Sequence, residues 1–251
     1  GEEKRRKTLE VISTMPFTRY EIFFNKVIIA LVNILTPFLI NVAIMLLALG
    51  FSKGLRDFYT AGLVINWFWA NAFRLLVIMS FSLLFASLTG TSISQLVLTI
   101  IFFVFPIGFV GLIDMNMVLW GYRTHVIYEF LDIFARYTIP GVLDGIKNIP
   151  IVFHSISAVL MLLASKFLFD MNKLERSGET LEFESLETFF KVGVTGCVSL
   201  LFGVIFTEII GGIVYFSGAV PRIITIVGYI LGVALGWFIA NYSIKLNRTK
   251  A

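Results

Sequence analysis

Two oppositely charged side chains inside apolar segments are the first residues whose chemistry stands out. Arg74 and Glu208 each lie within a long apolar run, about two helical turns from the end of that run. A charge in the lipid interior is costly and is usually paired or set against a polar cavity. We therefore predict an ion pair between Arg74 and Glu208, or a polar pocket that both line. The alternative is that Arg74 extends alone to the membrane surface, as long cationic side chains do.

Residues that could carry out catalysis or hold a metal are few. The chain has two histidines, His125 and His154, and one cysteine, Cys197, and none has companions at the spacing of a metal site. There is no G-x-x-x-x-G-K-[ST] motif for nucleotide phosphates and no dinucleotide-binding fingerprint. A single cysteine also excludes an intrachain disulfide. We therefore expect a protein that is not an enzyme and has no metal or cofactor of its own.

The composition predicts the class of protein. Hydrophobic residues make up 58% of the 251 residues and charged residues 14%, whereas soluble domains are about 45–50% apolar and about 25% charged. Only helices and closed barrels satisfy their backbone hydrogen bonds within lipid. The predicted fold class is all-α, a polytopic helical membrane protein with a single transmembrane domain over residues 1–251. We expect membrane lipid as a partner and no nucleic acid.

About six apolar segments are long enough to span a membrane, since a helix of about 20 apolar residues crosses a bilayer. The predicted spans are residues 27–50, 67–88, 94–113, 151–169, 192–216 and 223–243. They divide the domain into a charged segment, four spans with an external loop at 114–150, a polar loop, and two spans with a tail. These four parts are residues 1–26, 27–169, 170–191 and 192–251.

The stretch 128–137 within the external loop predicts a helix that lies on the membrane surface. At helical spacing, its apolar and charged side chains fall on different faces, which is typical of interfacial helices. The apolar face holds Phe130, Ile133 and Phe134, and the charged face holds Glu129, Asp132 and Arg136. This helix would lie on the side of the membrane opposite to the two ends of the chain.

Glycines recur every four residues in the last predicted span, at Gly228, Gly232 and Gly236. Small residues at this spacing share one helical face and allow another helix to approach closely. The pattern therefore predicts a tight helix–helix contact. The partner helix could belong to the same chain or to a second subunit.

The charged segment 1–26 predicts two short helices. Pro16 ends the first, about residues 3–14, because the residue before a proline is pushed out of the helical region. Thr18 and Glu21 then form a predicted capping box, which begins the helix that enters the bilayer. By its residues alone, this segment could also be a basic amphipathic helix that rests on anionic lipid.

The placement of the basic residues predicts the orientation. Six spans put both ends of the chain on one side, and most of the Lys and Arg outside the spans lie on that side. Because cytoplasmic loops carry an excess of Lys and Arg, we expect both ends in the cytoplasm. The segment 1–26 and the loop 170–191 then share the cytoplasmic face.

The stretch TLEVISTMPFTRYEIFFNK resembles the cytoplasmic segment of permeases of ATP-binding cassette (ABC) transporters of the type-2 exporter class. In that family an acidic residue precedes Thr-Leu-Glu, an apolar helix, a Pro, and an Arg/Tyr-Glu-Ile that leads to a Lys at the membrane. The matching positions are Glu3, Thr8, Leu9, Glu10, Pro16, Arg19, Tyr20, Glu21, Ile22 and Lys26. Where the family usually has Gly before the Thr, this chain has Lys7. A shorter likeness, ERSGETLEF with FFKVGV, is to a loop in some permeases of low-GC Gram-positive bacteria.

This resemblance implies a permease subunit in the bacterial cytoplasmic membrane that binds a separate ATPase on its cytoplasmic face. It also implies a homodimer or heterodimer of permeases, with ATP and Mg²⁺ bound by the ATPase and not by this chain. Since transmembrane helices precede the segment in this family, we expect a further part of the protein before Gly1. The residues implied to couple the ATPase are Thr8, Leu9, Glu10, Met15, Pro16, Arg19 and Glu21.

Two other functions remain open at this point. A non-transporting membrane scaffold or assembly protein would use the basic segment to rest on lipid. A secondary transporter would be expected to have inverted repeats and charged residues near the bilayer midplane. The sequence contains no convincing repeat, and Arg74 and Glu208 are predicted to lie off-centre in their spans. Dependence on a separate ATPase distinguishes the exporter from both. The substrate is open, although 26 Phe residues and few charges within the spans favour an amphipathic or lipid-like cargo.

Overall fold

The protein is an all-α chain of long helices, as the sequence predicts. The computed structural model describes residues 16–122, 125–143, 149–171, 184–213 and 220–248, and all regular elements within these ranges are helical. In chain order they are α3 (Arg19–Phe51), α4 (Lys53–Arg56), α5 (Ala61–Leu88), α6 (Ser92–Leu119), α7 (His125–Tyr137), the 3₁₀ turn η1 (Pro140–Leu143), α8 (Ile151–Met171), α9 (Glu184–Ile213) and α10 (Val220–Arg248).

Six of these helices are long and apolar enough to cross a membrane, which confirms the predicted number of spans. They are α3, α5, α6, α8, α9 and α10. The helices are longer than the predicted spans: α3 has 33 residues and so extends about 50 Å, against about 30 Å of hydrocarbon. Hydropathy marks only the part of a helix within lipid, whereas the backbone hydrogen bonds continue beyond it.

The predicted polar loop at 170–191 is shorter than expected. Helix α8 continues to Met171, and α9 begins at Glu184, so about the last third of this stretch is helical. The loop was predicted from its charged residues. Charge ends a membrane span but does not end a helix, because Glu and Lys are good helix formers.

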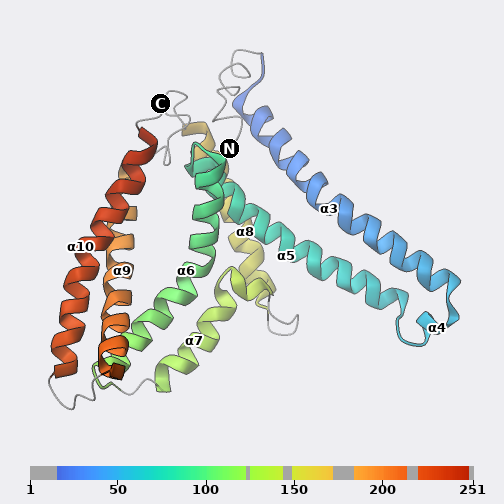
Figure 1. Ribbon diagram of the computed structural model, residues 1–251. Coiled ribbons are helices and arrows are strands. Elements are labelled where there is room, and N and C mark those ends of the chain that lie inside the picture. The colour runs from blue at the N-terminus through green and yellow to red at the C-terminus, as the bar shows by residue number, and fades with distance from the viewer. Residues whose placement is uncertain (1–15, 123–124, 144–148, 172–183, 214–219, 249–251) are drawn as a thin grey trace.

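The helices form two groups joined by α6 (Figure 1). Helices α9 and α10 pack as an antiparallel pair along most of their length, and α3, α5 and α8 form the other group. Helix α6 contacts both α5 and α9, and it changes direction along its length, with Pro106 inside it. A proline removes one hydrogen bond of the helix and commonly bends it.

The two ends of the described chain lie at the same end of the molecule. The start of α3 and the end of α10 are at the top in Figure 1, and α4 and α7 are at the bottom. Helix α7 includes the predicted interfacial stretch, with Phe130 and Ile133 exposed and Asp132 paired with Arg136. Six passes through a membrane lead to this arrangement.

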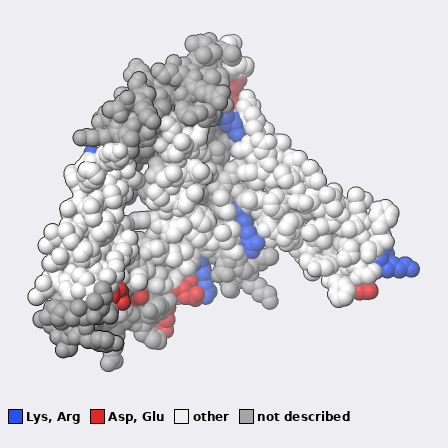
Figure 2. All heavy atoms as spheres, viewed as in Figure 1, with Lys and Arg blue, Asp and Glu red and all other residues white. Residues whose placement is uncertain are grey.

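The buried core is small and aromatic. It centres on Phe81 and Phe85 of α5 and Leu98 of α6, with Phe102 and Phe103 packed against them. The ring centroids of Phe81 and Phe85 lie 4.9 Å apart. Most other large apolar side chains are exposed, and the visible charged groups gather mainly toward the ends of the molecule (Figure 2). A lipid-facing surface has this distribution.

Candidate functional site

The start of α3 is capped as the sequence predicts. The Thr18 amide donates to Glu21 Oε2 over 2.8 Å, and the Glu21 amide donates to Thr18 Oγ1 over 3.3 Å. These reciprocal bonds form a capping box, which satisfies two amides that the helix itself leaves unpaired. Thr18 therefore caps the N-terminus of α3, and the helix begins shortly after Pro16.

Arg19, the first residue of α3, contacts the last turn of α8. Its Nη1 donates to the backbone carbonyl oxygen of Asp170 over 2.6 Å, across 151 positions of sequence. Carbonyls in the last turn of a helix have no partner within the helix, and the negative end of the helix dipole lies there. An arginine is well suited to this position, because it brings both a donor and a positive charge.

Two aromatic contacts reinforce this attachment. Lys166 Nζ lies 5.3 Å from the centroid of the Tyr20 ring, which is within the range of a cation–π interaction. The rings of Phe23 and Phe169 lie 5.6 Å apart. We name the group the α3–α8 joint, and it consists of Arg19, Tyr20, Phe23, Lys166, Phe169 and Asp170.

Helix α8 links this joint to α5. The hydroxyls of Ser165 and Ser87 lie 2.7 Å apart, and Ser165 Oγ also donates to the Leu83 carbonyl over 2.9 Å. Both serine side chains are buried. Hydrogen bonds between spans hold helices together in lipid, where a buried hydroxyl has no water to bond instead.

The other end of α8 is attached to α7. His154 is fully buried, and its Nε2 lies 3.0 Å from the carbonyl oxygen of Arg136 at the end of α7. Because a carbonyl only accepts, Nε2 carries the proton of this bond. The ring of the neighbouring Phe153 meets Tyr137 edge-on at 5.1 Å. Helix α8 therefore contacts α3 at one end of the molecule and α7 at the other.

Arg74 does not pair with Glu208 within the described chain. Arg74 Nε donates to the carbonyl oxygen of Val142 in η1 over 3.0 Å, and Nη1 donates to Asn71 Oδ1 over 3.4 Å. Glu208 lies on α9 and is exposed. The described chain does not bring the predicted pair together, because α5 packs against α8, α3, α6 and η1, whereas α9 packs against α10 and the other side of the bundle at α6.

Arg74 also lies farther from the start of its helix than from the start of the predicted span. Helix α5 begins at Ala61 and not at residue 67, so Arg74 lies near the middle of the helix and not two turns from its start. Its guanidinium is partly buried. The lone-arginine alternative is not seen either, because the charge is held by the protein at η1.

The three glycines of α10 lie against α9 of the same chain. A Cβ at Gly228 would lie 2.8 Å from the Phe202 carbonyl oxygen, and one at Gly232 would lie 2.6 Å from Ser199 Cα. At Gly236 it would lie 2.8 Å from Thr195 Cα. The close approach that the spacing predicts is therefore present, and its partner is the adjacent helix.

A polar network joins α6 to this pair of helices. The Tyr229 hydroxyl donates to Asn116 Oδ1 over 2.7 Å and accepts from Trp120 Nε1 over 3.1 Å. Asn116 Nδ2 donates in turn to the Leu200 carbonyl over 3.3 Å. Gly203 of α9 leaves room for the Tyr229 ring, since a Cβ there would overlap it. Close packing and shared hydrogen bonds thus hold α6, α9 and α10 together.

The structure describes only part of the predicted coupling segment. Thr8, Leu9, Glu10 and Met15 lie outside the described residues, whereas Pro16, Arg19 and Glu21 are described and exposed. Sequence reasoning missed Lys166, Asp170 and Tyr229. The first two lie at the end of a span, where a positive charge and free carbonyls are expected, but no pattern assigns them to α3.

The fold and these contacts define a multi-pass α-helical membrane protein. In the described ranges, no group of three or more His, Cys, Asp or Glu could hold a metal ion. Comparison of the chain with family models, with curated proteins and with solved structures finds no match. A finer function is therefore a proposal, which rests on the α3–α8 joint and on the resemblance of the segment before it.

Proposed function

We propose that this chain is the membrane-spanning permease subunit of an ATP-driven exporter of the type-2 ABC class. The segment around Thr8–Glu10 and Arg19–Glu21 resembles the part of such permeases that contacts the ATPase. The observation that carries the proposal is the bond from Arg19 to the Asp170 carbonyl. It ties the first helix after that segment to a second span.

The α3–α8 joint gives a physical route for transmission. A displacement of the segment before α3 would be transmitted to Arg19. The capping box between Thr18 and Glu21 encloses Arg19 and fixes the segment to the first turn of the helix. Since Arg19 holds the end of α8, both helices move together. Ser165 then carries the displacement to α5, and His154 carries it to α7 at the far end.

In this proposal the end of the molecule that holds the joint faces the cytoplasm. The ATPase binds there and holds ATP and Mg²⁺, while this chain holds neither. Two permeases, alike or different, form the transmembrane unit in a bacterial cytoplasmic membrane. The excess of Lys and Arg at this end supports the orientation.

Co-purification tests the proposal. The full-length protein is isolated in mild detergent from its native host, and the ATPase that comes with it is quantified for the native chain and for Glu10→Ala with Arg19→Ala. We expect the native chain to bring an ATPase and the double variant to lose most of it. Arg19→Ala alone removes one hydrogen bond from a charged donor, so we expect a loss of about fivefold.

Arg56→Ala is the matched control. Arg56 also bonds carbonyls in the last turn of a helix, those of Leu49 and Gly50 in α3, but at the opposite end of the molecule. We expect this variant to keep its ATPase. If the folded native chain brings no ATPase, the exporter proposal fails and the membrane scaffold becomes the better one. If Arg56→Ala loses the ATPase as strongly as Arg19→Ala, the joint has no special role.

A further inference from the structure

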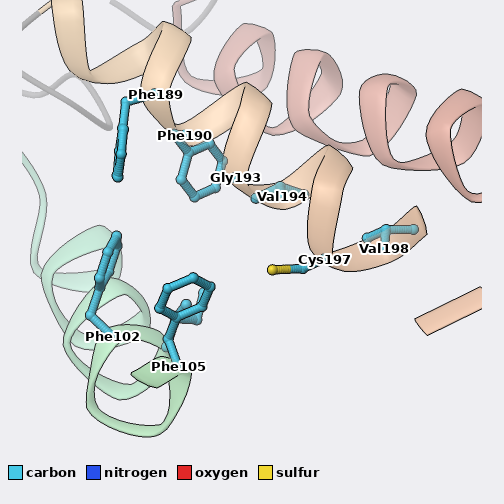
Figure 3. Close-up of a pocket in the computed structure, with 9 residues that line it drawn as sticks. Phe102, Phe105, Phe189, Phe190, Gly193, Val194, Cys197 and Val198 are labelled. Atoms are coloured by element: carbon cyan, nitrogen blue, oxygen red, sulfur yellow. The ribbon is translucent and has the colours of Figure 1, made fainter. Parts of the chain in front are cut away.

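An apolar slot lies between α6 and α9, away from the α3–α8 joint. Figure 3 shows Phe102 and Phe105 of α6 facing Phe190 and Cys197 of α9 across it. Its cavity volume is about 170 Å³, which is smaller than the range of about 300–1,000 Å³ that is typical of pockets for whole drug-sized ligands. The residues that line it are Ile101, Phe102, Phe105, Phe189, Phe190, Gly193, Val194, Cys197 and Val198.

The slot runs along the first half of α9. It follows α9 from Phe189 to Val198, a rise of about 14 Å. Both α6 and α9 start at the end of the molecule where α3 starts, and the slot lies on the parts of these helices nearer that end. Its walls are apolar, which suits a hydrocarbon chain.

A positive charge lies on α9 next to the first lining residues of the slot, although Lys191 does not itself line it. Lys191 is on the same turn of α9 as Phe189 and Phe190 and is partly exposed. The other nearby charge on this helix, Glu187, lies one turn earlier and is buried. Lys191 is therefore the accessible charge where a lipid phosphate would sit, because a lysine near a helix end extends toward the membrane surface.

The dimensions favour a single chain over a helix as the occupant. Spread over about 14 Å, the cavity volume has a mean cross-section of about 12 Å². A helix about 10 Å across needs roughly 80 Å². A helix of a second subunit would therefore not enter the slot without separating α6 from α9.

We propose that the slot binds one acyl chain of an anionic phospholipid, with the phosphate at Lys191. The lipid would fill the space that α6 leaves beside α9 and would hold the two groups of helices at a fixed separation. This inference stands on the slot and Lys191 and does not rest on transport. Its test is a binding measurement, so it can fail or succeed whatever the ATPase experiment shows.

Gly193 allows the slot to be filled by substitution. A Cβ at Gly193 would meet no atom within 4 Å, and the same is true at Gly196, which is exposed and not among the lining residues. Gly193→Phe therefore places a ring in the slot, whereas Gly196→Phe places the same ring on the outer surface of the same helix. Both glycines are in a helix interior, where a larger residue costs little backbone stability.

The test uses native mass spectrometry of the full-length protein with phosphatidylglycerol and, separately, phosphatidylcholine of the same acyl chains. We expect one retained phosphatidylglycerol on the native chain and on Gly196→Phe, and at least about tenfold weaker retention on Gly193→Phe. Lys191→Gln should bind both lipids about equally. Equal retention by Gly193→Phe and Gly196→Phe, or no preference for the anionic lipid on the native chain, overturns the proposal.

Cys197 gives a second measurement that needs no substitution. It is the only cysteine of the 251 residues, and its thiol faces the slot in Figure 3. Removal of lipid from the native protein should speed its reaction with a small maleimide several-fold, and phosphatidylglycerol should slow it again. A rate that phosphatidylglycerol leaves unchanged contradicts the proposal, even if a variant fails to fold.

Discussion

At the scale of single residues, arginines at the carbonyl ends of helices are the recurring device. Arg19 donates to the last turn of α8, Arg56 to the last turn of α3, and Arg74 to η1. Such carbonyls have no partner within the helix and carry the negative end of its dipole. In lipid, a guanidinium on these carbonyls satisfies several polar groups at once. The bond to η1 thus explains how the protein holds the charge of Arg74 without the predicted ion pair.

A stability measurement distinguishes the contact of Arg74 with η1 from the predicted ion pair with Glu208. We expect Arg74→Gln to lower the free energy of unfolding by about 1.5–3 kcal/mol, because a charged donor to the buried Val142 carbonyl is lost. Glu208→Gln should have little effect, since Glu208 is exposed. Denaturation in detergent of both variants and of the double variant measures this.

The double variant is the decisive member of that series. Residues without a shared contact have additive effects to within about 0.5 kcal/mol, so we expect the two changes to sum. A coupling clearly larger than that would restore the ion pair between Arg74 and Glu208. So would a double charge reversal, Arg74→Glu with Glu208→Arg, that rescues a defect of either single reversal.

At the scale of elements, the tightest contact is the pair α9 and α10. Gly228, Gly232 and Gly236 of α10 bring the two backbones together. In addition, the ring of Tyr229 on α10 packs over Gly203 of α9. Helices in lipid gain little from hiding apolar area, because the lipid is apolar as well. Their association depends on close packing and on hydrogen bonds such as that from Ser199 Oγ to the Tyr229 carbonyl.

A single methyl group tests this packing. We expect Gly232→Ala to lower stability by about 1–3 kcal/mol, because its Cβ would lie 2.6 Å from Ser199 Cα and the backbone has to shift. Gly196→Ala on the facing helix is the control. Its Cβ meets no atom within 4 Å, so the better helix propensity should stabilise by about 0.5–1 kcal/mol.

Thermal unfolding in detergent measures the change in stability of both glycine variants. The two changes add the same methyl group to the same pair of helices, so the expected difference in sign isolates the contact. A Gly232→Ala variant as stable as Gly196→Ala would mean that α9 and α10 are further apart than described.

At the scale of the whole molecule, the chain is built for a lipid environment. Few side chains are buried, and α3 has none that is buried along 33 residues. In water such a surface would aggregate, whereas in a bilayer it is solvated. The charged groups at the two ends of the molecule then lie in the headgroup regions, and Arg74 is held inside by the protein.

The orientation in the membrane can be measured at two exposed aromatic positions outside the long helices. Phe17 precedes α3, and Tyr59 lies between α4 and α5 at the other end. In a Cys197→Ser background, we expect Tyr59→Cys to react with an impermeant maleimide in intact cells. Phe17→Cys should react only after the cells are made permeable, because both ends of the chain are proposed to be cytoplasmic.

The reverse labelling pattern would place the α3–α8 joint outside the cell. An ATPase could not reach the joint there, so that result would exclude the exporter while leaving the six-span fold intact. Labelling of both positions in intact cells would indicate leakage, which a cytoplasmic protein labelled in the same cells controls for.

The sequence by itself determined the features that depend on local patterns. Apolar length predicted six spans, and the spacing of Thr18 and Glu21 predicted the capping box at the start of α3. The repeat of glycines predicted a close helix contact. Each of these follows from residues within a few turns of one another, whose hydropathy, hydrogen bonding or size acts along a single helix.

Only the tertiary structure decided which helices meet. Arg19 and Asp170 are 151 positions apart, and no local pattern relates them. Hydropathy is almost the same on every lipid-facing helix, so it cannot say that α10 packs on α9 or that Arg74 meets η1 and not Glu208. Those choices depend on shape and on the few polar groups that need a partner, and both become defined only when the helices are placed together.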